Sequence, residues 1–305
     1  MQSTGVSFEQ AAVLANYAHN AATFHVRPGR PEDTAACGKI CYEAFKIISE
    51  THNFPPDFPS VGAATELMAA ILPKPGVYSV VAESEGRILG SNFLWEDTIG
   101  GVGPITVDPA VQNAAIGRRL MQAVLDHSRR NGSAGVRLVQ AAYHNRSLSL
   151  YAKLGFVVRE PLATIQGPAI NERMPGYDVR PADEQDMEYC STLCYTVHGH
   201  ARLTELRDAI RQSSATVVVR HGRLTAYATG IGFFGHAVAE TNEDIKALIA
   251  AAPAFAGPGF LLPTRNAELF RWCLEKGLRV VQPMTLMSIG LYNEPAGNFL
   301  PSILY

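Results

Sequence analysis

The chain has 305 residues, of which 47% are hydrophobic and 18% are charged, the balance of a globular protein long enough for two domains. Its net charge of −2, with no long run of one sign, argues against nucleic acid or a membrane surface as a partner. Met1 to Asn20 lacks the basic cluster and apolar core of a signal peptide, and no stretch reaches the ~20 apolar residues of a membrane span. We therefore expect a cytoplasmic enzyme.

An internal repeat organises the chain, with corresponding residues 153 positions apart. Each copy predicts a short strand, a turn and a helix capped near an aspartate. The matched residues are Val26, Arg27, Pro28, Asp33, Cys37, Cys41 and Tyr42 in the first copy and Val179, Arg180, Pro181, Asp186, Cys190, Cys194 and Tyr195 in the second. We expect a helical extension at residues 1–23, with a helix over 7–19, and domains at 24–168 and 177–305 joined by a linker rich in Pro and Gly.

The cysteines of the repeat lie four residues apart in each copy, so each pair occupies one face of its helix. Four thiolates could form a zinc site, but structural zinc usually takes closer spacing on turns. Buried, small apolar side chains are the favoured alternative. No metal is expected.

Paired strands follow in both copies. Tyr78–Glu83 and Arg87–Trp95 are joined at Glu85-Gly86, and Thr216–Arg220 and Arg223–Gly230 are joined at His221-Gly222. Glycine at each junction is typical of a hairpin turn.

The stretch Gly101–Val107 predicts a strand that ends at Asp108-Pro109. A loop of small residues, 112–117, then leads into a helix that stops at Asn131-Gly132. The N-terminus of such a helix can bind an anion, because unpaired N–H groups and the positive end of the helix dipole converge there. Taken alone, the segment fits an ordinary strand–helix connector equally well.

The next segment favours a specific ligand. Val136–Gln140 predicts a strand, and Asn145 to Gly155-Phe156 predicts a helix that closes into another strand. Gln112-x-x-Ala115-x-Gly117, followed by Asn145, Tyr151 and Gly155-Phe156, resembles the motifs of the GCN5-related N-acetyltransferase (GNAT) superfamily over roughly residues 24–166. Ala115 stands where the family pattern usually has glycine, and alanine tolerates a positive φ poorly.

The resemblance implies an α/β (α+β) fold of two tandem GNAT-like domains, each a mixed, mostly antiparallel twisted sheet flanked by helices. It also implies acetyl-CoA as co-substrate and a set of residues that bind it. The backbone of Ile105, Thr106 and Val107 should pair with the pantetheine arm, and the amides of Gln112, Asn113, Ala114, Ala115, Ile116 and Gly117 should hold the pyrophosphate. Arg118 is a candidate phosphate ligand or a solvated arginine. Asn145 contacts the cofactor arm or only caps its helix.

Catalytic roles also follow from the resemblance. Tyr151 is the candidate general acid, or else a tyrosine packed beside Phe156. Glu96, at the end of a strand, is a weaker candidate for a base acting through water, and solvation is the simpler explanation. His52, Phe54 and Asp57 belong to a proline-rich loop that either receives the substrate or is only structural.

The second copy keeps the scaffold but alters the anion site. Thr241-x-x-Asp244 predicts a capping box on the N–H groups that a pyrophosphate would need, and nearby carboxylates would repel phosphate. We expect this half to be degenerate in cofactor binding, which also counts against the tandem transferases that make mycothiol. It should help to shape the substrate cleft, with the tail 298–305 packed there. The predicted function is acetyl transfer to a small-molecule amine, with a non-catalytic acyl-CoA sensor as the alternative; the oligomeric state stays open.

Overall fold

Residues 23–112 and 114–304 are described by the structure, a computed structural model. The predicted helix over residues 7–19 and the cofactor candidate Asn113 lie outside the described residues. The chain divides into two units, one made of the residues up to Glu96 and 102–132, the other of 97–101 and the residues from Ser133 onward. Each unit is described by itself.

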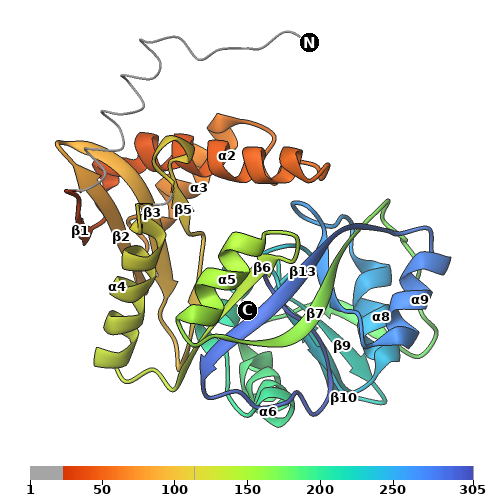
Figure 1. Cartoon of the computed structure of the whole chain (residues 1–305). Coiled ribbons are helices and arrows are strands. Elements are labelled where there is room, and N and C mark those ends of the chain that lie inside the picture. The colour runs from red at the N-terminus through yellow and green to blue at the C-terminus, as the bar shows by residue number, and fades with distance from the viewer. Residues whose placement is uncertain (1–22, 113, 305) are drawn as a thin grey trace, which may run out of the picture. The chain divides into compact units, whose positions relative to one another are not determined.

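The first unit is an antiparallel sheet in the order β1-β2-β3-β5 with helices α2, α3 and α4 (Figure 1). Its elements are β1 (His25–Pro28), η1 (Pro31–Asp33), α2 (Thr34–Thr51), α3 (Val61–Ile71), β2 (Val77–Ser84), β3 (Arg87–Trp95), β5 (Thr106–Val107), η2 (Pro109–Val111) and α4 (Ile116–Arg130). The predicted apolar face of α4 is buried against this sheet, with Leu120, Met121 and Val124 fully enclosed.

The second unit contains two sheets. The first has the order β4-β6-β13-β7-β12, and the second the order β14-β11-β10-β9-β8. The first-sheet strands and nearby helix are β4 (Ile99–Val102), β6 (Gly135–Ala141), α5 (Asn145–Lys153), β7 (Val157–Gln166), β12 (Phe260–Pro263) and β13 (Arg279–Gly290). The remaining elements are β8 (Asp178–Pro181), η3 (Glu184–Asp186), α6 (Met187–His198), α7 (Leu203–Arg211), β9 (Thr216–Arg220), β10 (Arg223–Ala228), β11 (Ala237–Ala239), α8 (Asn242–Ala251), α9 (Ala267–Glu275) and β14 (Asn298–Leu300).

Strand β13 joins the two copies of the repeat. It belongs to the second copy, yet it lies between β6 and β7 of the first and pairs antiparallel with both (Figure 1). Strand β7 of the first copy in turn pairs with β12 of the second. The copies therefore exchange strands, so the two units do not follow the boundaries of the repeat. The domains at 24–168 and 177–305 stay a prediction about the repeat.

The predicted fold class is confirmed. Among the strands of the described residues, only β4 and β6 pair in parallel, over Ile99–Gly101 and Gly135–Arg137. The predicted hairpins are present as β2–β3 and β9–β10. Both turn residues have positive φ in each hairpin: 50° and 78° at Glu85-Gly86, and 51° and 74° at His221-Gly222. Such turns match the twist of the flanking strands.

The aspartates at the helix starts have a different role from the predicted one. Asp33 and Asp186 are the N-cap residues of α2 and α6, as predicted, but neither side chain caps its helix. Instead each carboxylate accepts two hydrogen bonds from the arginine six residues earlier, Arg27 or Arg180, at 2.7–2.8 Å. The same fork in both copies supports the repeat, since a paired guanidinium and carboxylate hold strand and helix together at a fixed spacing.

The repeat cysteines are buried, as predicted. Burial raises the pKa of Cys37 to about 11 and that of Cys190 to about 12, so the thiols stay protonated at neutral pH. Within residues 23–112 and 114–304, no group of three or more His, Cys, Asp or Glu side chains converges as a metal site.

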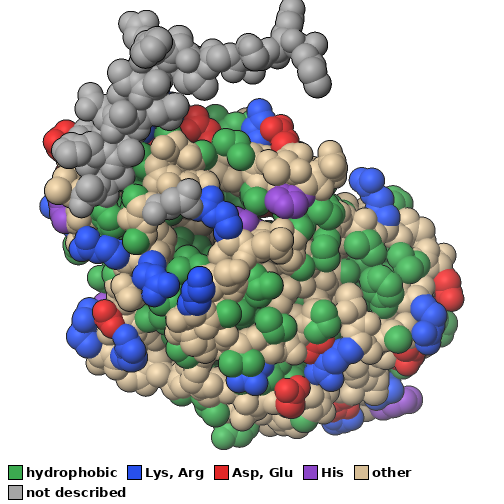
Figure 2. All heavy atoms as spheres, viewed as in Figure 1, with side chains coloured by type: hydrophobic (Ala, Val, Ile, Leu, Met, Phe, Trp, Pro, Cys, Tyr) green, Lys and Arg blue, Asp and Glu red, His purple; other side chains and the backbone are tan. Residues whose placement is uncertain are grey.

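In Figure 2, Lys and Arg side chains gather over α4, where the sequence has Arg118, Arg119, Arg129 and Arg130 beside the single acid Asp126. No helix in the part of the chain that the structure describes has the length and apolar character needed to cross a membrane.

We predict that Asp33→Asn lowers the free energy of unfolding by about 1–3 kcal/mol at pH 7, because the Arg27 guanidinium loses the forked carboxylate of Asp33 and keeps only its ion pair with Glu83. The hydrogen bond from Arg27 holds the pKa of the Asp33 carboxyl below its usual 3.8. This stabilisation is therefore complete above about pH 4 and is lost as the pH falls through the folded-state pKa. Urea denaturation from pH 2.5 to 7 measures both effects. Asp126→Asn, in an exposed pair with Arg129, is the control and should change stability by less than about 0.5 kcal/mol; an equal loss in both variants would contradict the prediction.

Candidate active site

The predicted cofactor strand is interrupted. The sequence predicted one strand over Gly101–Val107, but β4 ends at Val102 and β5 covers only Thr106–Val107. Pro104, joined to Gly103 by a cis peptide bond, lies in the gap and cannot donate a ladder hydrogen bond. Ile105 therefore lies just before a strand, not within one.

Strand β5 has one paired edge. Thr106 and Val107 pair with Ser91 and Gly90 of β3. This approach needs a glycine, because a Cβ on Gly90 would lie 2.5 Å from the Thr106 carbonyl oxygen. Among the described residues no strand pairs with the other edge of β5. That edge can accept the backbone-like amides of an added ligand.

Within the part of the chain that the structure describes, no side chain caps the first turn of α4. Its N-cap residue is Ala115, which has no polar atom to accept a hydrogen bond from the turn. The turn carries no acid, while the last turn carries His127, Arg129 and Arg130. The carboxylate of Asp108 accepts from the Ala110 N–H and pairs with Arg87. The first-turn N–H groups of α4 thus have no acceptor from the N-cap side chain, the arrangement found where helix N-termini bind phosphate.

Ala115 adopts the left-handed conformation, with φ 60° and ψ 9°. The family pattern usually has glycine here, which takes this conformation without steric cost. An alanine in the same conformation costs on the order of 1 kcal/mol. The loop thus keeps the backbone shape of a glycine loop despite its alanine.

The two arginines of this turn differ in their contacts. Arg119 donates to the Phe24 carbonyl at 3.2 Å and lies over the Phe24 ring. Arg118 is exposed, and its side chain contacts no partner among the described residues. Arg118 is therefore the better phosphate candidate. Nearby, the side chain of Ile116 is buried, so only its backbone faces a ligand, whereas Gln112 is exposed.

Helix α5 carries Asn145 and Tyr151 in the other unit. Asn145 does not cap α5, contrary to one predicted role: the N-cap is His144, whose Nδ1 contacts the Ser147 hydroxyl at 2.8 Å. Tyr151 is 5% exposed, and its ring lies 6.1 Å from that of Phe156. Burial raises the pKa of Tyr151 to about 12, although a hydrogen bond with Ser147 lowers it in part. The phenol is therefore protonated at every physiological pH.

Glu96 lies at the far end of α4 from the anion site. Its carboxylate accepts hydrogen bonds from His127 Nε2 at 2.8 Å and Asn131 Nδ2 at 2.7 Å. The His127 ring stacks on Tyr78, with centroids 3.5 Å apart. His127 is about 15 Å along the helix from the first turn of α4. The sequence analysis missed this cluster, and a histidine in the last turn of α4 was the only signal for it.

His52, Phe54 and Asp57 lie together in the loop between α2 and α3. His52 ends α2 and donates from Nδ1 to the Ile48 carbonyl at 2.9 Å. The Phe54 N–H bonds the Ser49 carbonyl at 2.9 Å. Each of the three side chains is half-buried, so the loop is folded back on α2.

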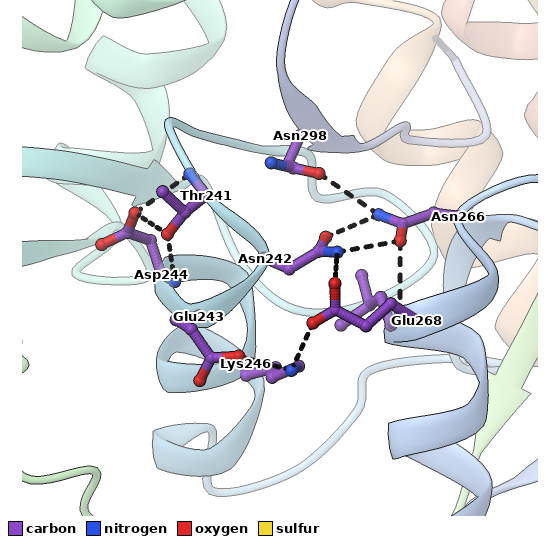
Figure 3. Close-up of polar contacts among 9 residues, drawn as sticks. Thr241, Asn242, Glu243, Asp244, Lys246, Asn266, Glu268 and Asn298 are labelled. Carbon is purple, nitrogen blue, oxygen red and sulfur yellow. Dashed lines mark hydrogen bonds and ion pairs between the residues drawn. The ribbon is translucent and has the colours of Figure 1, made fainter.

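The second copy closes its corresponding helix end, as predicted. The Thr241 hydroxyl accepts from the Asp244 N–H, and the Asp244 carboxylate accepts from the Thr241 N–H (Figure 3). Asn242, at the start of α8, exchanges side-chain hydrogen bonds with Asn266, the N-cap of α9 (Figure 3). In α8, a side chain of the chain itself thus bonds a first-turn N–H group. The N-cap side chain of α4 makes no such bond.

The backbone also identifies the counterpart of Tyr151. The Phe156 N–H bonds the Tyr151 carbonyl after α5, and the Leu278 N–H bonds the Cys273 carbonyl after α9. Cys273 therefore occupies the position of Tyr151. Burial raises the pKa of this thiol to about 12. The second copy has no phenol at this position.

Comparison with known proteins agrees with this geometry. A family model described as the acetyltransferase (GNAT) domain matches residues 75–158, from β2 to the start of β7. An IAA acetyltransferase from Azospirillum brasilense is 33% identical over 93 residues, which are 30% of this chain and 61% of that protein. Residues 75–158 of the chain are therefore similar to a GNAT acetyltransferase domain. The match spans less than two thirds of the length of that relative.

The tandem GNAT fold extends over the whole chain. A candidate acetyltransferase from Pyrococcus horikoshii superposes with a TM-score of 0.71 at 15% identity, over 100% of this chain and 98% of that one. A tandem GNAT protein from the clavulanic acid biosynthesis pathway gives 0.53 at 12% identity, over 88% and 98%. At these identities the likeness shows the fold alone.

Within the GNAT fold, the predicted site residues fall into separate groups. Thr106, Val107 and residues 114–118 belong to the first unit, as do the loop at 52–57 and Glu96. Asn145 and Tyr151 belong to the second unit, on α5. Within the first unit, Glu96 is separated from the anion site by the length of α4.

We predict that Ala115→Gly in this GNAT loop raises the free energy of unfolding by up to about 1 kcal/mol, because glycine removes the steric cost of the positive φ. The gain is reduced by the extra backbone freedom of glycine in the unfolded chain. Chemical denaturation measures it. Ala114→Gly is the matched control, since Ala114 has no positive φ; it should give no gain, and a gain of equal size there would contradict this explanation.

Proposed function

We propose that this chain transfers the acetyl group of acetyl-CoA to the amine of a small molecule. The observation that carries the proposal is the uncapped N-terminus of α4, which follows a strand with an unpaired edge inside the segment matched by the GNAT domain. An open strand edge suits the amides of a pantetheine arm, and the helix end suits its pyrophosphate.

In this proposal the backbone of Ile105, Thr106 and Val107 binds the pantetheine arm. The amides of residues 112–117, Asn113 included, hold the pyrophosphate, and Arg118 pairs with a phosphate oxygen. Asn145 contacts the arm. The fit is supported by the absence of acidic residues from the first turn of α4 and by the exposed guanidinium of Arg118.

Acetyl-CoA supplies an activated thioester, so that an N–C bond forms to the acceptor while the C–S bond breaks. The attacking amine must be neutral, whereas an ordinary alkyl ammonium has a pKa of ~10.4. A base must therefore take one proton, and the departing thiolate must be stabilised.

Tyr151 is the proposed acid for the leaving sulfur. Because its pKa is about 12, whereas a thiol resembling cysteine has a pKa of ~8.5, full proton transfer to sulfur would be uphill by roughly 5 kcal/mol. The phenol therefore acts mainly by donating a hydrogen bond to the developing thiolate. This requires it to stay protonated, which its burial ensures.

Glu96 is the proposed base, acting through water. Its carboxylate already accepts hydrogen bonds from His127 and Asn131. The loop with His52, Phe54 and Asp57 is the proposed acceptor wall. A small-molecule acceptor agrees with the name of the Azospirillum relative, an IAA acetyltransferase.

The second candidate function is a non-catalytic acyl-CoA sensor. The observation in its favour is that Tyr151 is deeply buried and that the carboxylate of Glu96 is already hydrogen-bonded twice. Both functions predict CoA binding. Thiol release from acetyl-CoA with a broad panel of amines separates them: tight binding without turnover on any amine would favour the sensor.

We predict that Gly117→Glu weakens binding of CoA and acetyl-CoA at least about a hundredfold. A carboxylate about 5 Å from the pyrophosphate costs roughly 3 kcal/mol per charge pair at an effective dielectric constant near 20. Calorimetry measures the affinity, and circular dichroism checks the fold. Gln122→Glu makes the same change in charge on the exposed face of α4 and should alter affinity only a few-fold. Unchanged affinity in Gly117→Glu would remove the cofactor site from this helix end.

We predict that Tyr151→Phe lowers kcat about a hundredfold and changes the affinity for acetyl-CoA less than threefold, because the hydroxyl acts on the leaving sulfur. With a pKa of about 12, Tyr151 should contribute no loss of activity as the pH rises from 7 to 10. Steady-state kinetics over this range test both points. Tyr195→Phe, at a tyrosine 64% exposed, is the control; equal rates in the two variants would exclude Tyr151 from the chemistry.

A further inference from the structure

The chain's own C-terminal strand pairs with the second copy's counterpart of the cofactor strand. β5 and β11 correspond, since each pairs antiparallel with the second strand of a hairpin, β3 or β10, and each precedes the helix α4 or α8. The other edge of β11 pairs with β14, with Ala237 opposite Leu300 and Ala239 opposite Asn298. The strand edge proposed to take pantetheine in the first copy is thus already paired in the second.

The tail is firmly packed. Phe299 is 5% exposed and meets the ring of His198 edge-on, and Leu300 is part of the hydrophobic core. Beyond β14, the Ile303 N–H bonds the Phe233 carbonyl at 2.8 Å. Ser302 is fully buried and accepts from Arg202 at 3.4 Å. Packing and hydrogen-bond contacts therefore extend from Phe299 to Ile303, as expected of a segment that is part of the folded domain.

Side chains tie the tail to the two helix ends of the second copy. Asn298 accepts a hydrogen bond from Asn266, the N-cap of α9 (Figure 3). Asn298 also donates to the Glu240 carbonyl, which lies just before the N-terminus of α8. Asn266 is also bonded to Asn242 of α8. Side-chain hydrogen bonds therefore connect the tail strand to the N-cap of α9 and, through Asn266, to the first residue of α8.

The tail also reaches β4. The carbonyl oxygen of Leu304 lies so close to Gly101 that a Cβ on that glycine would be 2.3 Å from it. Gly101 pairs with Arg137 of β6 and is followed, a few residues later, by β5. The segment that fills the second copy thus ends against the strand that leads into the proposed cofactor strand of the first.

We propose that residues 297–304 are a built-in substitute for the pantetheine arm in the second copy, so that each chain binds one acetyl-CoA, in its first copy only. This rests on the proposed function for the identity of the ligand. The tail provides the strand partner, and Thr241 with Asp244 provides the acceptors that a pyrophosphate would offer. In the second copy, both the edge of β11 and the first turn of α8 therefore have hydrogen-bond partners from the chain itself, without a cofactor.

Hydrogen exchange with mass spectrometry on the full chain, with and without saturating acetyl-CoA, tests the proposal, and calorimetry gives the stoichiometry. Amides of β11 and of the first turn of α8 should be protected without ligand and unchanged by it. Amides of β5 and of the first turn of α4 should gain protection on binding. The stoichiometry should be one. Ligand-dependent protection in β11 or α8, or a stoichiometry of two, overturns the proposal.

The variant Phe299→Ala tests whether the tail itself protects β11. Loss of the buried ring should speed exchange of the β11 amides at least about tenfold, while the first turn of α4 still responds to acetyl-CoA. Tyr189→Ala, at a tyrosine 66% exposed in the same copy, is the matched control and should leave β11 unchanged. Exchange in β11 that is equal in both variants and the parent overturns the proposal.

The outcome also separates this inference from the proposed function. If neither copy binds acetyl-CoA, the proposed function fails, and the exchange rates alone decide the role of the tail. In that case β11 amides that are protected in the parent and exposed in Phe299→Ala support tail pairing, and β11 amides unprotected in the parent overturn it.

Discussion

The N–H groups in the first turn of an α-helix have no acceptor within the helix, and the two copies of the repeat satisfy them in different ways. In α8, Thr241 and Asp244 supply the acceptors from the chain itself. In α4 the N-cap is an alanine with no acceptor to offer. Under the proposed function, this difference decides which copy binds a diphosphate, because the same backbone groups cannot serve both a cap and a ligand.

The two copies also differ in whether the strand before this helix is paired on both edges. A strand edge presents unpaired N–H and C=O groups that require a partner. In the second copy β14 pairs with β11, whereas β5 pairs only with β3 among the described residues. The copies also exchange their last strands, since β13 lies between β6 and β7. Through this exchange, one sheet contains strands of both copies.

Burial determines the chemistry open to the candidate acid. The same hydroxyl in water would have a pKa near 10, and desolvation raises that of Tyr151 to about 12. A more weakly acidic phenol remains a hydrogen-bond donor over a wider pH range, but it gives up its proton less readily. Its environment thus favours stabilisation of charge on sulfur over complete transfer of a proton. The counterpart, Cys273, has no hydroxyl to serve in this way.

Much of this protein followed from the sequence alone, because local patterns report local structure. The hairpins, the start of α4, the buried cysteines and the capping box at Thr241 all depend on residues close together in the chain. The family motif at Gln112–Gly117 and Tyr151 likewise depends on short spacings. Local patterns misled at two places: the Asp33 side chain bonds Arg27, six residues earlier, in place of capping its helix, and Pro104 interrupts the strand predicted over 101–107.

Only the tertiary structure decided how the copies are joined and which strand edge is occupied. Nothing in the spacing of Arg279–Gly290 indicates that this strand inserts into the first copy, since pairing partners more than a hundred residues apart leave no local signature. The tail was expected to pack in a substrate cleft, whereas β14 completes the sheet of the second copy. The sequence determined which helix end could hold an anion, and the tertiary structure decided which strand edge beside it was left unpaired, because strand pairing depends on proximity in space and not along the chain.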